Sequence, residues 1–376
     1  MKEGWEYKKL GDLCQVLDSQ RKPVTKKDRT KGIYPYYGAT GIQDYVDSYI
    51  FDGRFLLVGE DGAKWGASDK TAYIIEGKSW VNNHAHILKV LENVNDRLLE
   101  YYLTFKDLSE YITGAVVPKL TQKALVSIPI PIPPLSEQQH IVEELDLLSS
   151  IIEKKKAQLK ELDNLAQSLF YEMFGDPISN EKGWDKNVLN EVAKVTSSKR
   201  ILQSEWQEAG IPFYKVADIV NLINGECVTP LTFIKETTYN ELKSNGLVPK
   251  ANDVLITSRG TIGQCYIVKE HDSFYFQDGM ITWLSNINSL ISPTFLVALF
   301  ANDVFSDSLK HSANSSTVAY ISIKQLSNMK IPIPPLTLQQ QFASKIEAIE
   351  HQKELIKQSI KEVETLFNSR MDYYFN

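Results

Sequence analysis

The sequence predicts a mixed α/β (α+β) fold with two similar globular domains, separated by an antiparallel coiled coil of two long helices and related by a pseudo-two-fold axis. Three observations predict this arrangement. A ten-residue segment of the first half recurs in the second half. Apolar residues at alternating steps of four and three follow each copy, which is typical of paired helices. Short apolar segments punctuated by glycine precede each copy, which is typical of strands and turns.

The internal repeat joins a proline-rich segment to the residues that follow it. Ile-Pro-Ile-Pro-Pro-Leu-Ser-Glu-Gln-Gln at 130–139 returns as Ile-Pro-Ile-Pro-Pro-Leu-Thr-Leu-Gln-Gln at 331–340, an offset of 201 residues. The same offset aligns Phe174 with Phe375. Because the register continues through the following helix, chance low complexity is a poor explanation, and we interpret each half as a variable body with a similar C-terminal module.

Two long helices are predicted after the proline pairs. Proline cannot sit inside a helix, and Ser136 and Thr337 follow as expected N-caps. At about 1.5 Å per residue, each helix would span roughly 50–60 Å. The first helix ends where the second body begins, so the second helix must run back for the two seams to meet. The side chains expected to pair the helices are Leu145, Leu148, Ile152, Leu159, Leu162, Ile346, Ile349, Ile356, Ile360 and Val363.

One lysine interrupts each apolar seam. Lys155 and Lys353 occupy seam positions in different helices, where a buried ammonium is costly unless its stem extends to water. They would set the register of the pair or mark where an acidic group of a partner docks. A solvated lysine at the edge of the coiled coil is the plainer alternative.

These features divide the chain into four segments: a first domain at 1–134, a first helix at 135–175, a second domain at 176–335 and a second helix at 336–376. In the first domain, strands are expected at 49–51, 55–58, 72–75 and 86–90, with a helix at 97–111. In the second domain, strands are expected at 213–216, 254–257, 265–268 and 281–284, with a helix at 293–310.

Composition indicates a cytoplasmic protein without a membrane span. No run of 18 apolar residues is present, and the three cysteines form no CxxC pair. The net charge is −6, but its distribution is uneven. Residues 21–31 carry six cations and one acid, whereas residues 136–174 carry eight acids and four lysines. Acid collected on a helical spacer is compatible with basic binding surfaces elsewhere.

No motif for catalysis, cofactor or metal binding is complete. The sequence lacks the GxxxxGK[ST] phosphate loop, and its Pro-Pro pairs lack the flanking residues usual in amino-methyltransferases. His84 and His86 would face one side of a strand, but further metal ligands are missing, so strand packing is the simpler interpretation. Glu60 and Asp61 are adjacent acids on a glycine-rich turn, where solvated acids are common. We therefore expect no catalytic residue, no metal and no cofactor.

With these features the chain resembles the specificity subunits of Type I restriction–modification enzymes. The resemblance covers essentially the whole chain and is carried by 130–139 with 331–340, by the exit Phe-Gly-Asp-Pro at 174–177, and by Gly-Trp at 4–5 and 183–184. Segments 33–41, 51–53 and 59–62 are similar to its target recognition domains. Leu338 departs from the pattern, because Glu137 stands at that position in the first copy.

The resemblance implies a non-catalytic subunit that binds double-stranded DNA, with each domain reading one half of a split, asymmetric site. It also implies that the helices set the gap between the half-sites and carry two modification (methyltransferase) subunits, which motor-nuclease restriction subunits join later. Two alternatives remain: a coiled-coil scaffold for other proteins without a DNA role, and a DNA-modifying enzyme with an unrecognised active site.

Cations, amides and aromatic side chains on loops are the candidates for DNA contact, since phosphate contacts position a protein and base-edge contacts specify sequence. Arg259 and Lys64 are the strongest, because each lies on a glycine-flanked loop after a strand. An ordinary solvated role is the alternative for every candidate. The candidates are Lys22, Lys26, Lys27, Arg29, Tyr37, Lys64, Trp65 and Lys119 in the first domain, and Lys199, Arg200, Arg259, Lys310, His311, Asn314 and Ser316 in the second.

Overall fold

The computed structural model describes residues 4–226, 228–312 and 319–376. Contacts divide the chain into two units, one formed by residues 1–157 with 357–376 and the other by residues 158–356. Each unit therefore contains one globular body and part of both long helices. We call residues 4–134 the first head and residues 176–335 the second head; these boundaries remain those predicted from the sequence.

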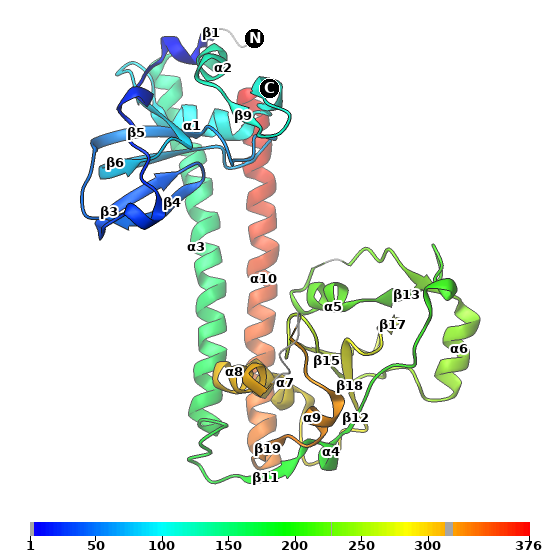
Figure 1. Ribbon diagram of the computed structural model, residues 1–376. Coiled ribbons are helices and arrows are strands. Elements are labelled where there is room, and N and C mark those ends of the chain that lie inside the picture. The colour runs from blue at the N-terminus through cyan, green and yellow to red at the C-terminus, as the bar shows by residue number, and fades with distance from the viewer. Residues whose placement is uncertain (1–3, 227, 313–318) are drawn as a thin grey trace. The chain divides into compact units, whose positions relative to one another are not determined.

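The first head is built on a six-stranded sheet of order β2-β7-β5-β6-β3-β4 (Figure 1). All neighbouring strands are antiparallel except β3 and β6, which are parallel. The strands and helices are β1 (Glu6–Lys9), β2 (Cys14–Val16), β3 (Lys31–Gly38), β4 (Gly41–Val46), β5 (Phe51–Gly59), β6 (Ala72–Val81), β7 (Ala85–Val90), α1 (Asp96–Phe105), β8 (Ile112–Thr113), β9 (Lys119–Leu120), α2 (Gln122–Ser127) and β10 (Pro129–Ile132).

The central strand β5 explains why this sheet is covered on both faces. Side chains alternate along a strand, and Leu56 and Val58 belong to one core cluster while Phe55 and Leu57 belong to another. The run Phe-Leu-Leu-Val thus buries its side chains to both sides, as expected for a strand with two apolar faces.

The second head repeats this plan with smaller sheets, of order β12-β18-β15-β16 and β14-β13-β17. In β15, Val254 and Ile256 enter one core cluster and Leu255 enters another. The elements are β11 (Asp185–Val188), α4 (Leu189–Val192), β12 (Lys194–Thr196), β13 (Ile211–Tyr214), α5 (Val216–Ile223), β14 (Phe233–Ile234), α6 (Glu236–Ser244), β15 (Val254–Thr257), β16 (Cys265–Ile267), β17 (Tyr275–Phe276), β18 (Ile281–Ser285), α7 (Pro293–Ala301), α8 (Asp303–Ser312), α9 (Ile323–Ser327) and β19 (Lys330–Ile333).

The proline-rich repeats close both heads in the same way. β10 pairs antiparallel with β1 near the chain's first described residues, and β19 pairs antiparallel with β11. Each pair is a separate two-stranded sheet, so the prolines occupy edge strands, where a missing N–H donor is tolerated.

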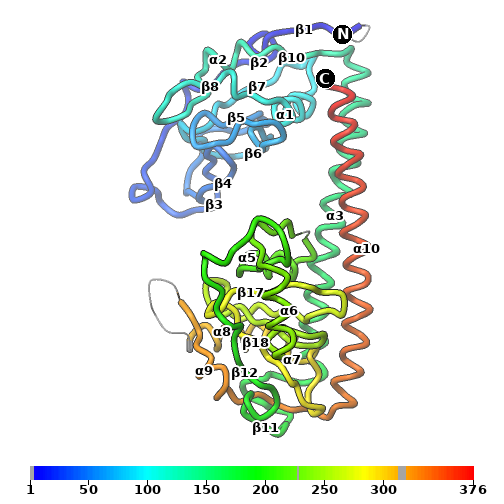
Figure 2. Tube along the Cα trace, turned by 90° about the vertical axis from the view of Figure 1, so that its right-hand side faces the viewer, coloured from blue at the N-terminus to red at the C-terminus, as the bar shows by residue number. Residues whose placement is uncertain are grey.

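The long helices are α3 (Leu135–Phe174) and α10 (Leu336–Phe375). Their antiparallel pairing is confirmed within each unit. In the first unit, Glu144 contacts Arg370 at 2.6 Å and Lys156 contacts Glu364 at 3.1 Å, so numbers rise along α3 as they fall along α10. In the second unit, Asp163 of α3 contacts Lys353 of α10 at 2.8 Å. Figure 2 shows the two helices running side by side.

The side chains predicted to pair the helices are all buried or half-buried. Leu145, Leu148, Ile152, Ile349 and Ile360 are buried. The half-buried members of the set are Leu159, Leu162, Ile346, Ile356 and Val363. The pattern is typical of a two-helix seam that is covered where the heads pack on it and partly wet elsewhere.

Five local predictions were wrong. α3 and α10 begin at Leu135 and Leu336, so Ser136 and Thr337 lie inside the first turn rather than at the N-cap. A proline fixes φ at a helical value directly before each start, which lets the helix begin one residue earlier. The strand predicted at 49–51 begins only at Phe51.

The other three errors concern where a strand or a helix ends. The strand predicted at 213–216 ends at Tyr214, and Val216 already begins α5. The helix predicted at 293–310 is two helices, because the buried Asn302 caps the second one by accepting a hydrogen bond from the N–H of Phe305 at 3.1 Å. The helix predicted at 97–111 ends at Phe105, where Lys106 turns extended.

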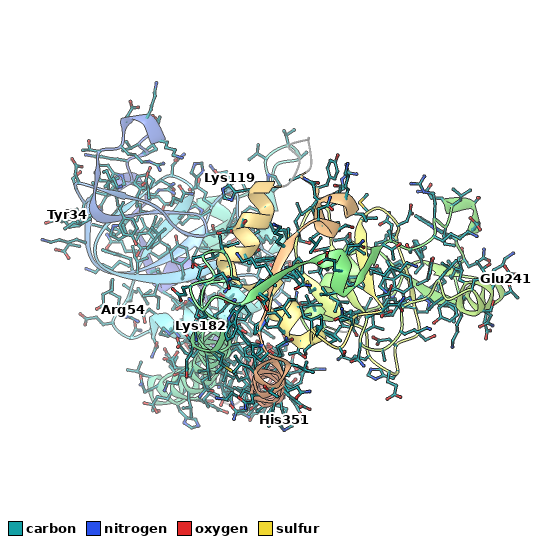
Figure 3. The ribbon with its side chains drawn as sticks, turned by 90° about the horizontal axis from the view of Figure 1, so that it is seen from below. Tyr34, Arg54, Lys119, Lys182, Glu241 and His351 are labelled. Carbon is teal, nitrogen blue, oxygen red and sulfur yellow. The ribbon has the colours of Figure 1, made fainter. Side chains whose placement is uncertain are left out.

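The end of α3 has a cap from a lysine. Nζ of Lys182, a residue labelled in Figure 3, donates to the backbone carbonyls of Glu172 and Met173 in the last turn. A cation at this end of a helix satisfies free carbonyls and opposes the helix dipole. Among the described residues, no helix is long and apolar enough to cross a membrane.

Candidate nucleic-acid interface

The basic segment 21–31 of the first head divides into structural and exposed cations. Arg29 donates through Nε to the carbonyl of Val24 at 3.1 Å and through Nη1 to Asp44 at 3.2 Å. Its guanidinium also lies 4.1 Å from the ring centre of Tyr36. Arg29 therefore holds the loop in place, and its contact with DNA stays a prediction.

Four lysines of this segment, Lys31 among them, are exposed, and three of the four are DNA candidates from the sequence. Lys22, Lys26 and Lys27 are exposed, and the last two form a short 3-10 helix with Asp28. The loop is tied to the sheet at Lys22, whose carbonyl accepts from the indole N–H of Trp80 at 2.6 Å, and at Arg29, which contacts Asp44 of β4. Exposed cations on an anchored loop suit phosphate contact.

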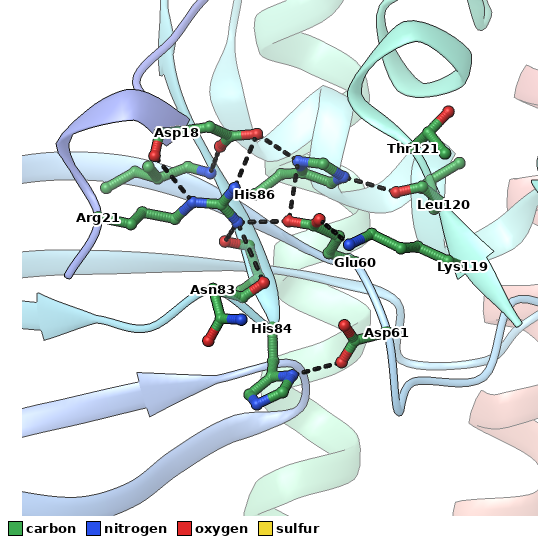
Figure 4. Close-up of polar contacts among 12 residues, drawn as sticks. Asp18, Arg21, Glu60, Asp61, Asn83, His84, His86, Lys119, Leu120 and Thr121 are labelled. Carbon is green, nitrogen blue, oxygen red and sulfur yellow. Dashed lines mark hydrogen bonds and ion pairs between the residues drawn. The ribbon is translucent and has the colours of Figure 1, made fainter. Parts of the chain in front are cut away.

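A buried ion network anchors the loop at its other end (Figure 4). Nη1 of Arg21 contacts a carboxylate oxygen of Glu60 at 2.5 Å and the carbonyl of Ala85 at 2.7 Å. Nζ of Lys119 contacts the other oxygen of Glu60 at 2.6 Å. The hydrogen bond to Glu60 raises the pKa of Lys119, so this candidate carries a charge that is already partly neutralised.

His86 sits at the centre of the same network and is 1% exposed. Its Nε2 donates to the carbonyl of Leu120 at 2.7 Å, and its Nδ1 faces Asp18 at 2.5 Å and Glu60 at 3.6 Å. Burial alone would raise the pKa of Asp18, but the hydrogen bond and charge of His86 and the bond from the N–H of Ile87 lower it below its ordinary value.

The network also has the composition of a metal site. Ligating atoms of Asp18, Glu60 and His86 lie within 4.8 Å of one another. However, Arg21 reaches both carboxylates and Lys119 reaches Glu60, so their negative charge already has cationic partners. The arrangement fits an ion-pair lock that holds the loop, and His86 and His84 do not form the paired site weighed from the sequence, because His84 contacts Asp61 instead.

The glycine-flanked loop after β5 presents one lysine and hides one tryptophan. Lys64 is exposed. Trp65 is 8% exposed, and its indole N–H donates to the carbonyl of Gly59 at 3.0 Å. Trp65 therefore belongs to the core of the first head and leaves the set of DNA candidates.

Tyr37 also faces the interior more than the surface. It is half-buried, its ring centre lies 6.0 Å from that of Tyr73, and its carbonyl accepts from the N–H of Asn82. Burial raises the pKa of Tyr37, so its hydroxyl stays protonated at neutral pH and can donate or accept a hydrogen bond.

Backbone contacts fix the turn at residues 60–62, directly after β5 in the first head. We call this turn, and its equivalent in the second head, the reading loop. The N–H of Glu60 donates to the carbonyl of His84 at 2.8 Å, and the N–H of Leu120 donates to the carbonyl of Glu60 at 2.8 Å. Asp61 forms an isolated antiparallel bridge with Lys119. Three chain segments thus meet around one turn after β5.

The second head has the same contacts with different side chains. The N–H of Ser258 donates to the carbonyl of Met280 at 2.9 Å, and the N–H of Ile321 donates to the carbonyl of Ser258 at 2.9 Å. Arg259 forms an isolated antiparallel bridge with Tyr320. Residues 60 and 61 of the first head therefore correspond to residues 258 and 259 of the second.

The buried centre of this frame differs in charge between the heads. Where the first head has Glu60 near His86, the second has Ser258, whose hydroxyl lies 2.6 Å from that of Thr282. Both hydroxyls are buried. A neutral hydrogen bond replaces the ion network, and among the described residues Arg259 forms no ion pair like that of Lys119 with Glu60.

The other candidates of the second head are exposed cations with partial partners. Lys199 is exposed and its N–H donates to the hydroxyl of Tyr275 at 2.7 Å. Arg200 contacts Asp278 at 2.9 Å with 73% of its side chain exposed. Lys199 and Arg200 are thus exposed cations of the segment that follows β12.

The last candidates lie at the C-terminal end of α8. Lys310 contacts Asp307 at 3.1 Å, and Nδ1 of His311 donates to the carbonyl of Asp307 at 2.6 Å. Asn314 and Ser316 lie outside the described residues. The sequence candidates for DNA contact did not include Asp61, Lys215 or Gln277. Asp61 was interpreted as a solvated acid of the turn at 59–62, and no local motif marks Lys215 or Gln277.

Comparison with known proteins gives one consistent result. A family model described as Type I restriction modification DNA specificity domain matches residues 2–163 and again residues 181–365. A putative type I restriction enzyme specificity subunit of Haemophilus influenzae is 32% identical over 374 residues, covering 98% of this chain and 94% of that protein. The MjaVIII specificity subunit of Methanocaldococcus jannaschii is 24% identical, covering 96% and 90%.

Solved structures show the same fold. The S subunit of a type I restriction–modification system from M. genitalium aligns with a TM-score of 0.59 at 14% identity, covering 98% of this chain and 95% of that one. A chain from a structure described as showing complex assembly and conformational transition of the type I R-M system aligns with a TM-score of 0.54 at 16% identity.

Proposed function

Because the chain belongs to the family of type I restriction–modification DNA specificity proteins, we propose that it recognises a split, asymmetric DNA sequence, with one half-site read by each head. One observation carries this proposal. The two heads share the backbone frame of the reading loop but differ in its side chains, with Asp61 in one and Arg259 in the other. Equal frames with unequal chemistry suit two unlike half-sites.

The chain's part in this activity is recognition rather than catalysis. The relatives that it matches are named specificity subunits, and the conspicuous buried polar cluster of the first head has its charges paired internally. We propose that two modification subunits carry out the chemistry on the DNA and that motor-nuclease restriction subunits join them. The complex would act in the cytoplasm.

The paired helices offer two equal docking positions. Leu165 of α3 and Leu366 of α10 are related by the 201-residue repeat and are 51% and 48% exposed. Leu135 and Leu336, at the starts of the two helices, are likewise 56% and 38% exposed. Repeated exposed leucines support two copies of one partner, and the length of the helices would fix the spacing of the half-sites.

The experiment combines the full chain with its modification subunits and a library of random duplexes. Methylation-sensitive sequencing of the modified DNA should return one motif with two short specified parts and an unspecified gap of constant length. A complex that forms but modifies DNA without a split motif would overturn the proposal, as would specific modification by the partner subunits without this chain.

A further inference from the structure

The turns that carry Asp61 and Arg259 are equivalent beyond their hydrogen bonds. Each residue is followed by a glycine in the left-handed region, Gly62 with φ +69° and Gly260 with φ +79°. A Cβ added at either glycine would meet nothing within 4 Å. The left-handed backbone, rather than a lack of space, therefore favours glycine in both heads. Residues 61 and 259 thus occupy equivalent points of the two turns.

Arg259 borders a groove of about 630 Å³ on the second head. Its lining combines apolar side chains, mostly from α5, with groups that donate or accept hydrogen bonds. Arg259 is exposed and forms no ion pair within the part of the chain that the structure describes. The apolar lining residues include Val216, Ala217, Val220 and Met280, and the polar ones include Lys215, Asn221, Gln277 and Arg259.

One polar residue of this groove, Gln277, has an equivalent in the first head, Asn82. The N–H of Gln277 donates to the carbonyl of Tyr214 at 2.9 Å, just as the N–H of Asn82 donates to the carbonyl of Tyr37 at 3.0 Å. A carboxamide therefore follows the parallel strand pair beside the reading loop in both heads. Carboxamides and guanidinium groups are the side chains that bind base edges in pairs of hydrogen bonds.

Asp61 presents the opposite chemistry at the equivalent point. One of its carboxylate oxygens contacts Nδ1 of His84, and its side chain remains 20% exposed. A carboxylate held by a histidine is oriented and accepts hydrogen bonds from donors. Among base edges in the major groove, the amino groups of cytosine and adenine donate, whereas guanine offers two acceptors.

We infer that residues 61 and 259 are the same specificity-determining position in the two heads. Arg259 selects a guanine in the half-site of the second head, and Asp61, positioned by His84, selects a base with an amino group in the half-site of the first head. This inference rests on the proposed function and adds to it which residue of each head chooses a base, and which class of base it chooses.

The test uses full-length variants in the complex with the modification subunits, and reads the motif from methylation-sensitive sequencing of random duplexes. Arg259→Ala should relax one guanine position in one half of the motif by roughly tenfold to hundredfold and leave the other half unchanged. Asp61→Asn should relax one position in the other half by a similar factor. Lys243→Ala and Asp52→Asn are charge-matched controls at exposed positions of the same heads and should keep the motif.

Failure of this inference is distinguishable from failure of the proposed function. If the unaltered complex yields no split motif, the proposed function fails. If it yields one and both variants keep every base preference, the inference fails. A uniform loss of binding with a salt dependence reduced by about one ion would make Arg259 a phosphate contact and would also overturn it, as would relaxation of both half-sites by one variant.

Discussion

At the scale of single residues, the polar side chains of the first head do two separate jobs. Arg21, Asp18, Glu60 and His86 are buried or nearly so, and their ion pairs join three segments of the chain. Lys22 and Lys26 are exposed a few residues away. Buried charges are stable only when paired, so the network keeps the ends of the basic loop in place while the exposed lysines stay free to meet a ligand.

Asp18→Asn should destabilise the first head, because it removes the charge that faces His86 and keeps the size of the side chain. A loss of about 1–3 kcal/mol in the free energy of unfolding is expected at pH 7. The folded pKa of Asp18 is lowered, so its contribution is present above the unfolded pKa of about 3.9 and is lost as pH falls through the folded value.

Urea unfolding of the full chain at several pH values measures this effect. The difference between the parent and Asp18→Asn should shrink below about pH 4. Asp52→Asn, at an exposed position of β5, should show little difference at any pH. A gap that stays constant from pH 7 to pH 3 would contradict the argument.

At the scale of elements, the long helices gain stability where aromatic side chains enter a head. Phe170 of α3 is 2% exposed, and its ring centre lies 5.9 Å from that of Phe295 of α7 and 6.0 Å from that of Phe342 of α10. Helices of this kind owe most of their stability to packing. The ends of the helices are therefore anchored by the cores of the heads.

Phe170→Ala should cost about 3–5 kcal/mol, because it leaves a cavity in a packed aromatic cluster. Met371→Ala removes the side chain related to it by the repeat, which is 3% exposed in the first unit, and should cost about 2–5 kcal/mol. Thermal and urea unfolding would measure both. Leu165→Ala, on the same helix but half exposed, should change stability by less than about 0.5 kcal/mol.

The seam lysine Lys353 should matter much less. Its Nζ contacts Asp163 across the helices and Glu350 on its own helix, both at 2.8 Å. Burial alone would lower its pKa, but these two carboxylates raise it, so the residue is charged at neutral pH. Asp163 is 60% exposed, and water screens such a pair.

Lys353→Met should therefore change the free energy of unfolding by less than about 1 kcal/mol in either direction, since an apolar side chain can replace a paired ion in a seam. The parent, and not the variant, should lose stability modestly as salt is added. Unfolding curves at low and high salt provide the measurement. A loss of about 3 kcal/mol or more would show that the lysine fixes the pairing register.

At the scale of the whole molecule, the basic and acidic side chains are unevenly distributed along the chain. The net charge of −6 gives little general attraction for DNA, so binding must come from local positive segments. In the first head, the exposed lysines 22, 26 and 27 are such a segment. The acidic side chains of α3 lie on a helix to which the proposed function assigns no DNA contact, so they would not repel the DNA phosphates.

Replacing Lys22, Lys26 and Lys27 with alanine should weaken DNA binding by the complex and flatten its salt dependence. The slope of log affinity against log salt should fall by about 0.9 for each lysine that meets a phosphate. Lys9→Ala, Lys89→Ala and Lys123→Ala together remove the same charge from exposed positions on β1, β7 and α2. Equal slopes for the two triple variants, from titrations at several salt concentrations, would exclude the loop as a phosphate contact.

The architecture followed from patterns that are local or periodic along the chain. The repeat, the proline pairs and the apolar seam predicted two heads, two long helices and their antiparallel pairing, because helical and strand periods are properties of consecutive residues. Strand β15 was predicted with its observed bounds. The errors fell at element ends such as Asn302, where a side-chain cap decides and sequence pattern is weak.

The candidate site depended on the tertiary structure. The sequence identified Arg29, Trp65 and Lys119 by residue type, but their roles were set by Asp44, Gly59 and Glu60, which the fold alone brings near. The equivalence of Asp61 and Arg259 likewise rests on hydrogen bonds between distant segments. A sequence states which groups a protein has, whereas exposure and pairing, which decide whether a charge is free to bind, arise only when the chain has folded.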